Sequence, residues 1–105
     1  MTQPDIEKWW NDDMEALFAA VLGLSTVDEA ARFFRDLCTR HELEELAARW
    51  GVVRLLNEGH SYREIHEMSG VSTATITRIN DWLRHGTGGY AEALHRLGLS
   101  SGAER

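Results

Sequence analysis

Residues 61–81, with the sequence SYREIHEMSGVSTATITRIND, decide the fold. Ser61 and Glu64 have the three-residue spacing of a capping box, which predicts the start of a short helix. Gly70 is expected to end this helix, because glycine adopts the positive φ of a tight turn without steric cost. The stretch therefore begins with one helix and a turn.

The segment after the turn gives conflicting signals. Its residues Val71–Thr77 are mostly β-branched and alternate, which favours a strand by propensity alone. No other part of the chain has the pattern of a partner strand, however, and Ser72 or Thr73 can cap a helix. Helical spacing also begins at Ile76 within this run and continues beyond it, at Ile79 and Leu83. We predict a second helix here, and hence a helix-turn-helix over about residues 61–84.

The rest of the chain also has helical patterns, with capping-box spacing at Thr26 and Thr39. Four more helices are expected: Ile6–Val21 with an end near Gly23, Thr26 to Leu37, Thr39 to Leu56 with an end at Gly59, and Tyr90–Leu97. The predicted fold class is all-α, with about six helices. A length of 105 residues gives room for one domain, expected over residues 1–99 with a frayed tail at 100–105.

Composition limits the compartment and the chemistry. No apolar run approaches the ~18 residues of a membrane helix, and the first residues lack the pattern of a signal peptide. Cys38 is the single cysteine, so an internal disulfide is excluded and a reducing cytoplasm fits. We expect a cytoplasmic protein that does not bind membranes and carries no cofactor.

Charge is distributed unevenly along the chain. A net charge of −6 is unusual for a protein that binds nucleic acid. All of it lies in residues 1–59, because residues 60–96 carry four arginines and four carboxylates. The charge distribution therefore allows nucleic-acid binding only in the C-terminal half of the chain.

The second helix of the motif is the candidate interface. Its outward residues are short hydrogen-bonding side chains and one guanidinium: Ser72, Thr73, Thr75, Thr77 and Arg78. Such residues suit close approach to base edges and phosphates in a major groove. The alternative is a helical hairpin with a solvated, threonine-rich face. His66 and Ser69 depart from the general motif, which has a small and an apolar residue there.

Other residue groups predict no catalytic or metal site. The histidines do not have the spacing of zinc ligands. Cys38 and His41 lack an orienting pocket, so we interpret Cys38 as a buried small apolar residue and consider an enzyme the least favoured class. The four tryptophans are interpreted as core or dimer interface: Trp9, Trp10, Trp50 and Trp82.

The chain resembles the Trp repressor superfamily through Ser61, Arg63-Glu64, Gly70 and the run Ala74–Arg78. It is most similar to the YerC/YecD branch, in these further segments: Phe33–Thr39, Glu42–Leu46, Leu55-Leu56, Ser72–Arg78 and Gly88-Gly-Tyr90. The resemblance covers roughly residues 17–97. It implies an intertwined homodimer whose N-terminal helices interlock and whose helix-turn-helix binds a palindromic DNA operator.

The resemblance also implies roles for individual residues. Arg63 matches a base-contacting arginine, while Thr73, Ala74 and Thr77 match groove-facing residues. In the leading hypothesis the chain is a transcriptional regulator, whose arginines, including Arg84, contact double-stranded DNA. The alternative is an interaction or oligomerisation module whose helix-turn-helix docks a partner protein.

The effector pocket of the family is altered in this sequence. Thr75 and Arg78 match two of its residues, but Ala48 stands in the position of its second arginine and Trp82 in that of a serine. Tryptophan is therefore not expected to bind. We hypothesise that the Trp82 indole itself fills the position of a ligand, the alternative being that Trp82 belongs to the core between the last two helices.

Overall fold

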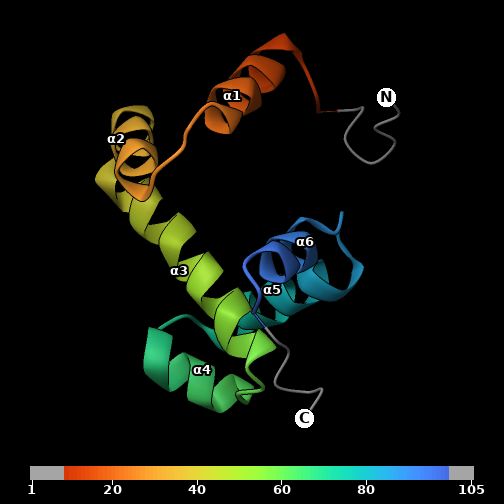
Figure 1. Ribbon diagram of the computed structural model, residues 1–105. Coiled ribbons are helices and arrows are strands. Elements are labelled where there is room, and N and C mark those ends of the chain that lie inside the picture. Colours follow the sequence, from red (N-terminus) through yellow and green to blue (C-terminus); the bar gives the residue numbers. More distant parts are fainter. Residues whose placement is uncertain (1–8, 100–105) are drawn as a thin grey trace. The chain divides into compact units, whose positions relative to one another are not determined.

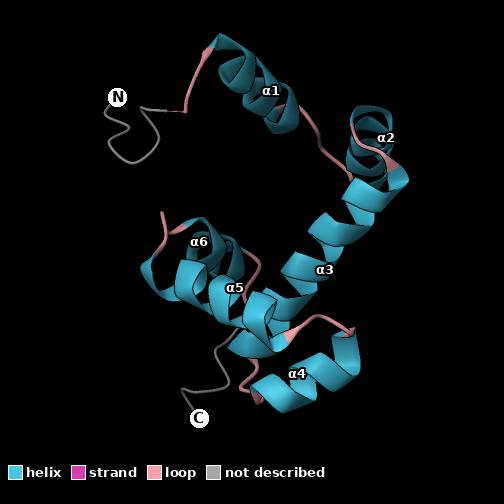
Figure 2. Cartoon of the chain, turned by 180° about the vertical axis from the view of Figure 1, so that it is seen from behind, coloured by secondary structure: helices cyan, strands magenta, loops and turns pink. Residues whose placement is uncertain are grey.

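The computed structural model describes residues 9–99, and the chain divides into two compact units, Met1–Leu43 and Glu44–Arg105. Residues 9–99 form helices joined by short loops, without a strand (Figures 1 and 2). The helices are α1 (Asp12–Leu22), α2 (Val27–Leu37), α3 (Arg40–Asn57), α4 (Tyr62–Ser69), α5 (Thr73–His85) and α6 (Gly89–Arg96). The all-α prediction is confirmed. None of the helices described is both long and apolar enough to cross a membrane.

Capping boxes fix the starts of two helices as the spacing predicts. At α3 the Thr39 hydroxyl accepts a bond from the Glu42 N–H (3.1 Å), and the Glu42 carboxylate accepts one from the Thr39 N–H (2.8 Å). Ser61 and Glu64 make the same reciprocal pair at α4, with distances of 3.1 and 2.8 Å. These bonds satisfy N–H groups that have no partner within the helix.

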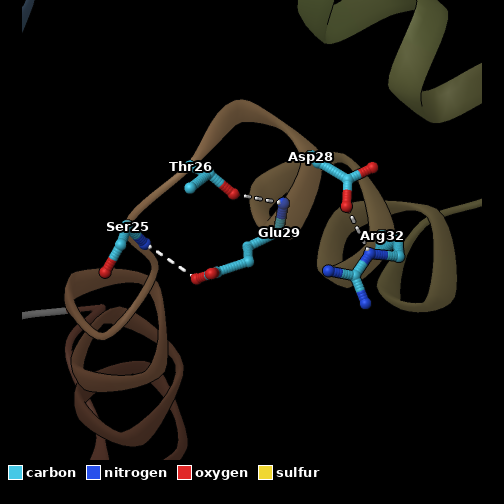
Figure 3. Close-up of polar contacts among 5 residues, drawn as sticks. All are labelled: Ser25, Thr26, Asp28, Glu29 and Arg32. Carbon is cyan, nitrogen blue, oxygen red and sulfur yellow. Dashed lines mark hydrogen bonds and ion pairs between the residues drawn. The ribbon is translucent and has the colours of Figure 1, made fainter.

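The start of α2 differs from the predicted box by one residue (Figure 3). The Thr26 hydroxyl accepts a bond from the Glu29 N–H at 3.0 Å, as expected. The Glu29 carboxylate, however, accepts from the N–H of Ser25 at 2.9 Å rather than from that of Thr26. Asp28 and Arg32 form an exposed ion pair (3.0 Å) one turn further on.

The prediction for the first helix was wrong at its start. α1 begins at Asp12, because the Asn11 side chain caps it by accepting a bond from the Met14 N–H at 2.9 Å. Trp9 and Trp10 therefore precede the helix, although their spacing fits its apolar face. Ile6 and the predicted tail at residues 100–105 lie outside the described residues, and the single domain over residues 1–99 stays a prediction.

The unit Glu44–Arg105 contains a continuous core. Side chains from four helices are buried in it: Val52, Val53 and Leu56 of α3, Ile65 of α4, Ile76 and Ile79 of α5, and Leu94 of α6. Trp50 packs at the edge of this core with its ring centroid 6.3 Å from that of Tyr90. The C-terminal end of α3 lies where α4, α5 and α6 converge (Figure 1).

The described residues of the unit Met1–Leu43 form no comparable core. In α1 and α2, both described in full, no residue is buried. Phe18 is 46 % exposed and Leu37 51 %, while Leu22 and Val27 are almost fully exposed. Cys38, interpreted above as buried, is only partly so and forms the C-cap of α2. These two helices alone bury too little apolar surface to fold independently.

The capping box of α4 makes stability depend on pH. The N–H and hydroxyl of Ser61 hold the pKa of the Glu64 carboxyl below its usual 4.5. Since folding favours the ionised form, this stabilisation is fully present above the unfolded-state pKa and is lost as pH falls through the lower folded-state pKa. We expect Glu64→Gln to lower Tm at pH 7, by on the order of a few degrees. At pH 3 the variant and the parent should differ much less.

Thermal unfolding by circular dichroism at both pH values tests this prediction. Glu92→Gln in α6 is the control, because it makes the same charge change away from the box. A Tm difference that is equal at pH 7 and pH 3 would contradict the role of the ionised Glu64 carboxylate.

Candidate nucleic-acid interface

The turn between α4 and α5 is held by hydrogen bonds of its side chains. Gly70 adopts a φ of 75°, the left-handed conformation that the sequence predicts. The Ser69 hydroxyl donates to the Ile65 carbonyl (2.6 Å) and accepts from the Val71 N–H (3.1 Å). His66 Nδ1 lies 2.8 Å from the Val71 carbonyl, which only accepts, so this nitrogen carries the proton and donates. The two departures from the general motif therefore stabilise its turn.

Packing of the apolar side chains orients α5. Ile65 of α4 and Ile76 and Ile79 of α5 have no exposed surface, and the two helices pack against each other. The opposite side of α5 is therefore left to solvent. All the residues predicted to contact DNA are exposed: Arg63, Ser72, Thr73, Ala74, Thr77, Arg78 and Arg84.

Helical geometry brings most of these side chains onto one surface of α5. At about 100° per residue, Thr73, Thr77 and Arg84 fall within about 40° of one another around the helix. Ala74 and Arg78 follow on the adjacent strip, about 100° to 140° from Thr73. Arg63 comes from α4 and is 87 % exposed. The Arg63 guanidinium lies 3.7 Å from the Glu67 carboxylate, and the two form an exposed ion pair. This partner was not predicted from the sequence.

The exposed hydroxyls differ in what they bind within the chain. The Thr77 hydroxyl donates to the Thr73 carbonyl at 2.9 Å. Ser72 caps α5 by accepting a bond from the Thr75 N–H at 3.2 Å. Thr75 is only partly exposed, and its hydroxyl oxygen lies 3.1 Å from Nη2 of Arg78. The sequence shows these residues at helical spacing but not which groups bind one another.

The N-terminus of α5 is electrostatically unlike those of the other helices in the described part of the chain. Each of those has a carboxylate in its first turn, whereas α5 has none. Helix N-termini carry a partial positive charge from their unpaired N–H groups. At α5 this charge is not offset by an acidic side chain, which favours an anion such as a phosphate there.

The hollow beside Trp82 does not include the other two residues of the possible effector pocket. Thr75, Arg78 and Trp82 share a side of α5. The hollow beside Trp82, of about 440 Å³, is lined instead by Gly86, Thr87, Gly89 and Tyr90. Trp82 is 46 % exposed, so it does not belong to the buried core between α5 and α6. Whether its indole takes the place of a ligand stays a hypothesis.

Gly86 shapes the end of α5 next to this hollow. Its N–H donates to the Trp82 carbonyl at 2.9 Å. A Cβ at position 86 would overlap the same carbonyl oxygen, which is backbone and cannot turn away. The chain therefore requires glycine where it leaves α5.

Ala48 is found at a second hollow of the same unit, of about 480 Å³. This hollow lies between α3 and α4, and its lining residues include Gly51, Arg54, Met68 and Ser69. Neither Thr75 nor Arg78 lines it. Among residues 9–99, His, Cys, Asp and Glu side chains form no group of three that could hold a metal ion.

Comparison with known proteins gives consistent matches over most of the chain. The sequence profile of the family described as "Trp repressor protein" matches residues 12–98. The uncharacterized protein YerC of Bacillus subtilis is 41 % identical over 92 residues, which are 88 % of either chain.

Solved structures match the fold closely. A crystal structure of a candidate Trp repressor from Staphylococcus aureus superposes with a TM-score of 0.86 at 35 % identity, over 94 % of this chain and 99 % of that one. A TrpR-like protein from Eubacterium eligens gives a TM-score of 0.83 at 41 % identity, over 90 % of this chain and 97 % of its own. The similarity extends well beyond the helix-turn-helix.

Proposed function

Because the chain belongs to the Trp repressor family, we propose that it is a sequence-specific DNA-binding transcriptional regulator that acts as a homodimer. Its helix-turn-helix enters the major groove of a palindromic operator with the N-terminal part of α5. Thr73, Ala74 and Thr77 contact base edges and thymine methyl groups. Arg63, Arg78 and Arg84 supply the contacts to phosphates and guanines.

One observation carries this proposal. The isoleucines that join α4 to α5 are fully buried, whereas the polar residues on the other side of α5 are exposed together. A recognition helix requires this division, since one side must be anchored while the other reaches base edges. The short side chains at positions 72–75 allow the backbone of α5 to approach the groove closely. The unopposed helix N-terminus adds attraction for a DNA phosphate.

The N-terminal unit supports the homodimer. α1 and α2 leave Leu22, Val27 and Leu37 more than half exposed. Water contact with so much aliphatic surface is unfavourable, and a second copy of the chain would bury it. Acidic residues are concentrated in residues 1–59, which keeps this half away from the phosphate backbone and leaves the helix-turn-helix of each protomer to face the DNA.

No effector is required by this proposal. Thr75 and Arg78 retain two positions of the family's pocket, but Ala48 offers no charge to a ligand carboxylate. Tryptophan is therefore not proposed as a ligand. The family consists of regulators rather than enzymes, and the described residues suggest no catalytic role.

Selection from a random double-stranded DNA library at physiological salt tests the function. We expect a palindromic motif with half-sites about one helical turn apart. A stable protein that enriches no motif over several rounds would contradict the proposal, and would favour docking of the helix-turn-helix to a partner protein.

Glu67→Gln is expected to raise affinity for the selected operator about two- to tenfold. The substitution frees the Arg63 guanidinium from its ion pair and removes a negative charge close to the DNA backbone. Fluorescence anisotropy at fixed salt measures the effect, with Glu92→Gln in α6 as the control of equal charge. If both variants bind equally, the Arg63–Glu67 pair does not limit DNA binding.

A further inference from the structure

The Thr75 hydroxyl is the centre of a chain of hydrogen bonds on α5. Its oxygen lies 3.1 Å from Arg78 Nη2, which donates to it. The Ser72 hydroxyl donates to the same oxygen, also at 3.1 Å. A hydroxyl oxygen has two lone pairs, so both acceptor positions of Thr75 are occupied. Ser72 is itself held as the N-cap of the helix.

These hydrogen bonds restrict the Arg78 side chain, which would otherwise be mobile. Arg78 is exposed, and arginine has many rotamers to lose when it binds. Thr75 is partly buried and β-branched, so its χ1 angle is restricted and its hydroxyl has a defined position. A guanidinium has five N–H donors in a fixed plane, and one bond to Thr75 leaves four for DNA.

We propose that Thr75 is a positioning residue, whose hydroxyl holds Arg78 in its DNA-binding orientation before the operator is met. The inference rests on the proposed function. In this arrangement the hydroxyls of Ser72 and Thr75 order the Arg78 guanidinium before binding. The entropic cost of ordering this side chain when DNA binds is therefore lower. Thr75 contributes to affinity through Arg78 and makes no independent contact with DNA.

Thr75→Val is the informative substitution, because valine has the same shape and lacks the hydroxyl. The backbone bond from position 75 to the Ser72 cap remains, so α5 should start as before. We expect about a tenfold loss of affinity for the selected operator and a Tm close to that of the parent. Thr75→Ser restores the hydroxyl and should recover most of the affinity.

A double-mutant cycle separates positioning from direct contact. Adding Thr75→Val to Arg78→Lys should cost little, because lysine lacks the planar fork that Thr75 orients. Full additivity of the two losses, or failure of Thr75→Ser to recover affinity, would overturn the inference while leaving DNA binding intact. Absence of operator binding by the parent protein would overturn the proposed function as well.

Discussion

Ile79→Ala is expected to lower the free energy of unfolding by about 2–5 kcal/mol. Ile79 has no exposed surface and belongs to the cluster that joins α3, α4, α5 and α6. Alanine removes its apolar contacts and leaves a cavity that the surrounding helices fill only in part. For a domain whose total stability is about 5–15 kcal/mol, this is a large fraction.

Urea unfolding at one fixed protomer concentration measures this loss, since dimerisation makes stability depend on concentration. Leu97→Ala is the control, because it removes an aliphatic side chain that is 65 % exposed. We expect the control to cost less than about 1 kcal/mol. Equal losses for the two variants would show that the cluster around Ile79 is not the core of the unit.

Arg78→Ala is expected to reduce affinity for the selected operator about 30-fold or more. The guanidinium is exposed on the α5 surface that faces the groove in our proposal, and a dimer loses two copies of it. One good arginine contact to a guanine contributes about 1–3 kcal/mol of discrimination. Since the side chain is not part of the core, Tm should change little.

Arg96→Ala provides the matched control for this loss. Arg96 is exposed in the last turn of α6, outside the helix-turn-helix, and its removal makes the same change in charge. Anisotropy titrations of both variants on specific and scrambled DNA give the comparison. Equal effects would indicate that general charge and not α5 governs binding. A partner protein that both variants bind normally, with no DNA bound by the parent, would support the interaction-module alternative.

Much of the fold could be predicted because its signals are local. The boxes at Thr39 and Ser61 and the positive φ at Gly70 follow from residue types at fixed spacing. The helical assignment of the β-branched run was also correct, since burial of Ile76 and Ile79 outweighs strand propensity. The start of α1 was not predictable from apolar spacing. The Asn11 cap makes Asp12 the first helical residue, whereas the apolar spacing continues upstream to Trp9 and Trp10.

The candidate site was predictable as a surface but not as a network. Outward positions on α5 follow from helical periodicity, and the structure exposes them as expected except for Thr75, which is only partly exposed. Which donor each hydroxyl accepts depends on rotamers, so the bond from Arg78 to Thr75 could not be deduced from the sequence. From the sequence, His66 and Ser69 could be identified only as departures from the general motif, because their hydrogen bonds to the turn have no sequence signature.

Dimethyl sulfate protection on the selected operator tests the central claim most directly, because this reagent methylates guanine N7 in the major groove. The account predicts two clusters of protected guanines, about one helical turn apart on one side of the duplex, and their loss with Arg78→Ala. Bound DNA whose guanines all stay reactive would contradict it, since α5 would then not lie in the major groove.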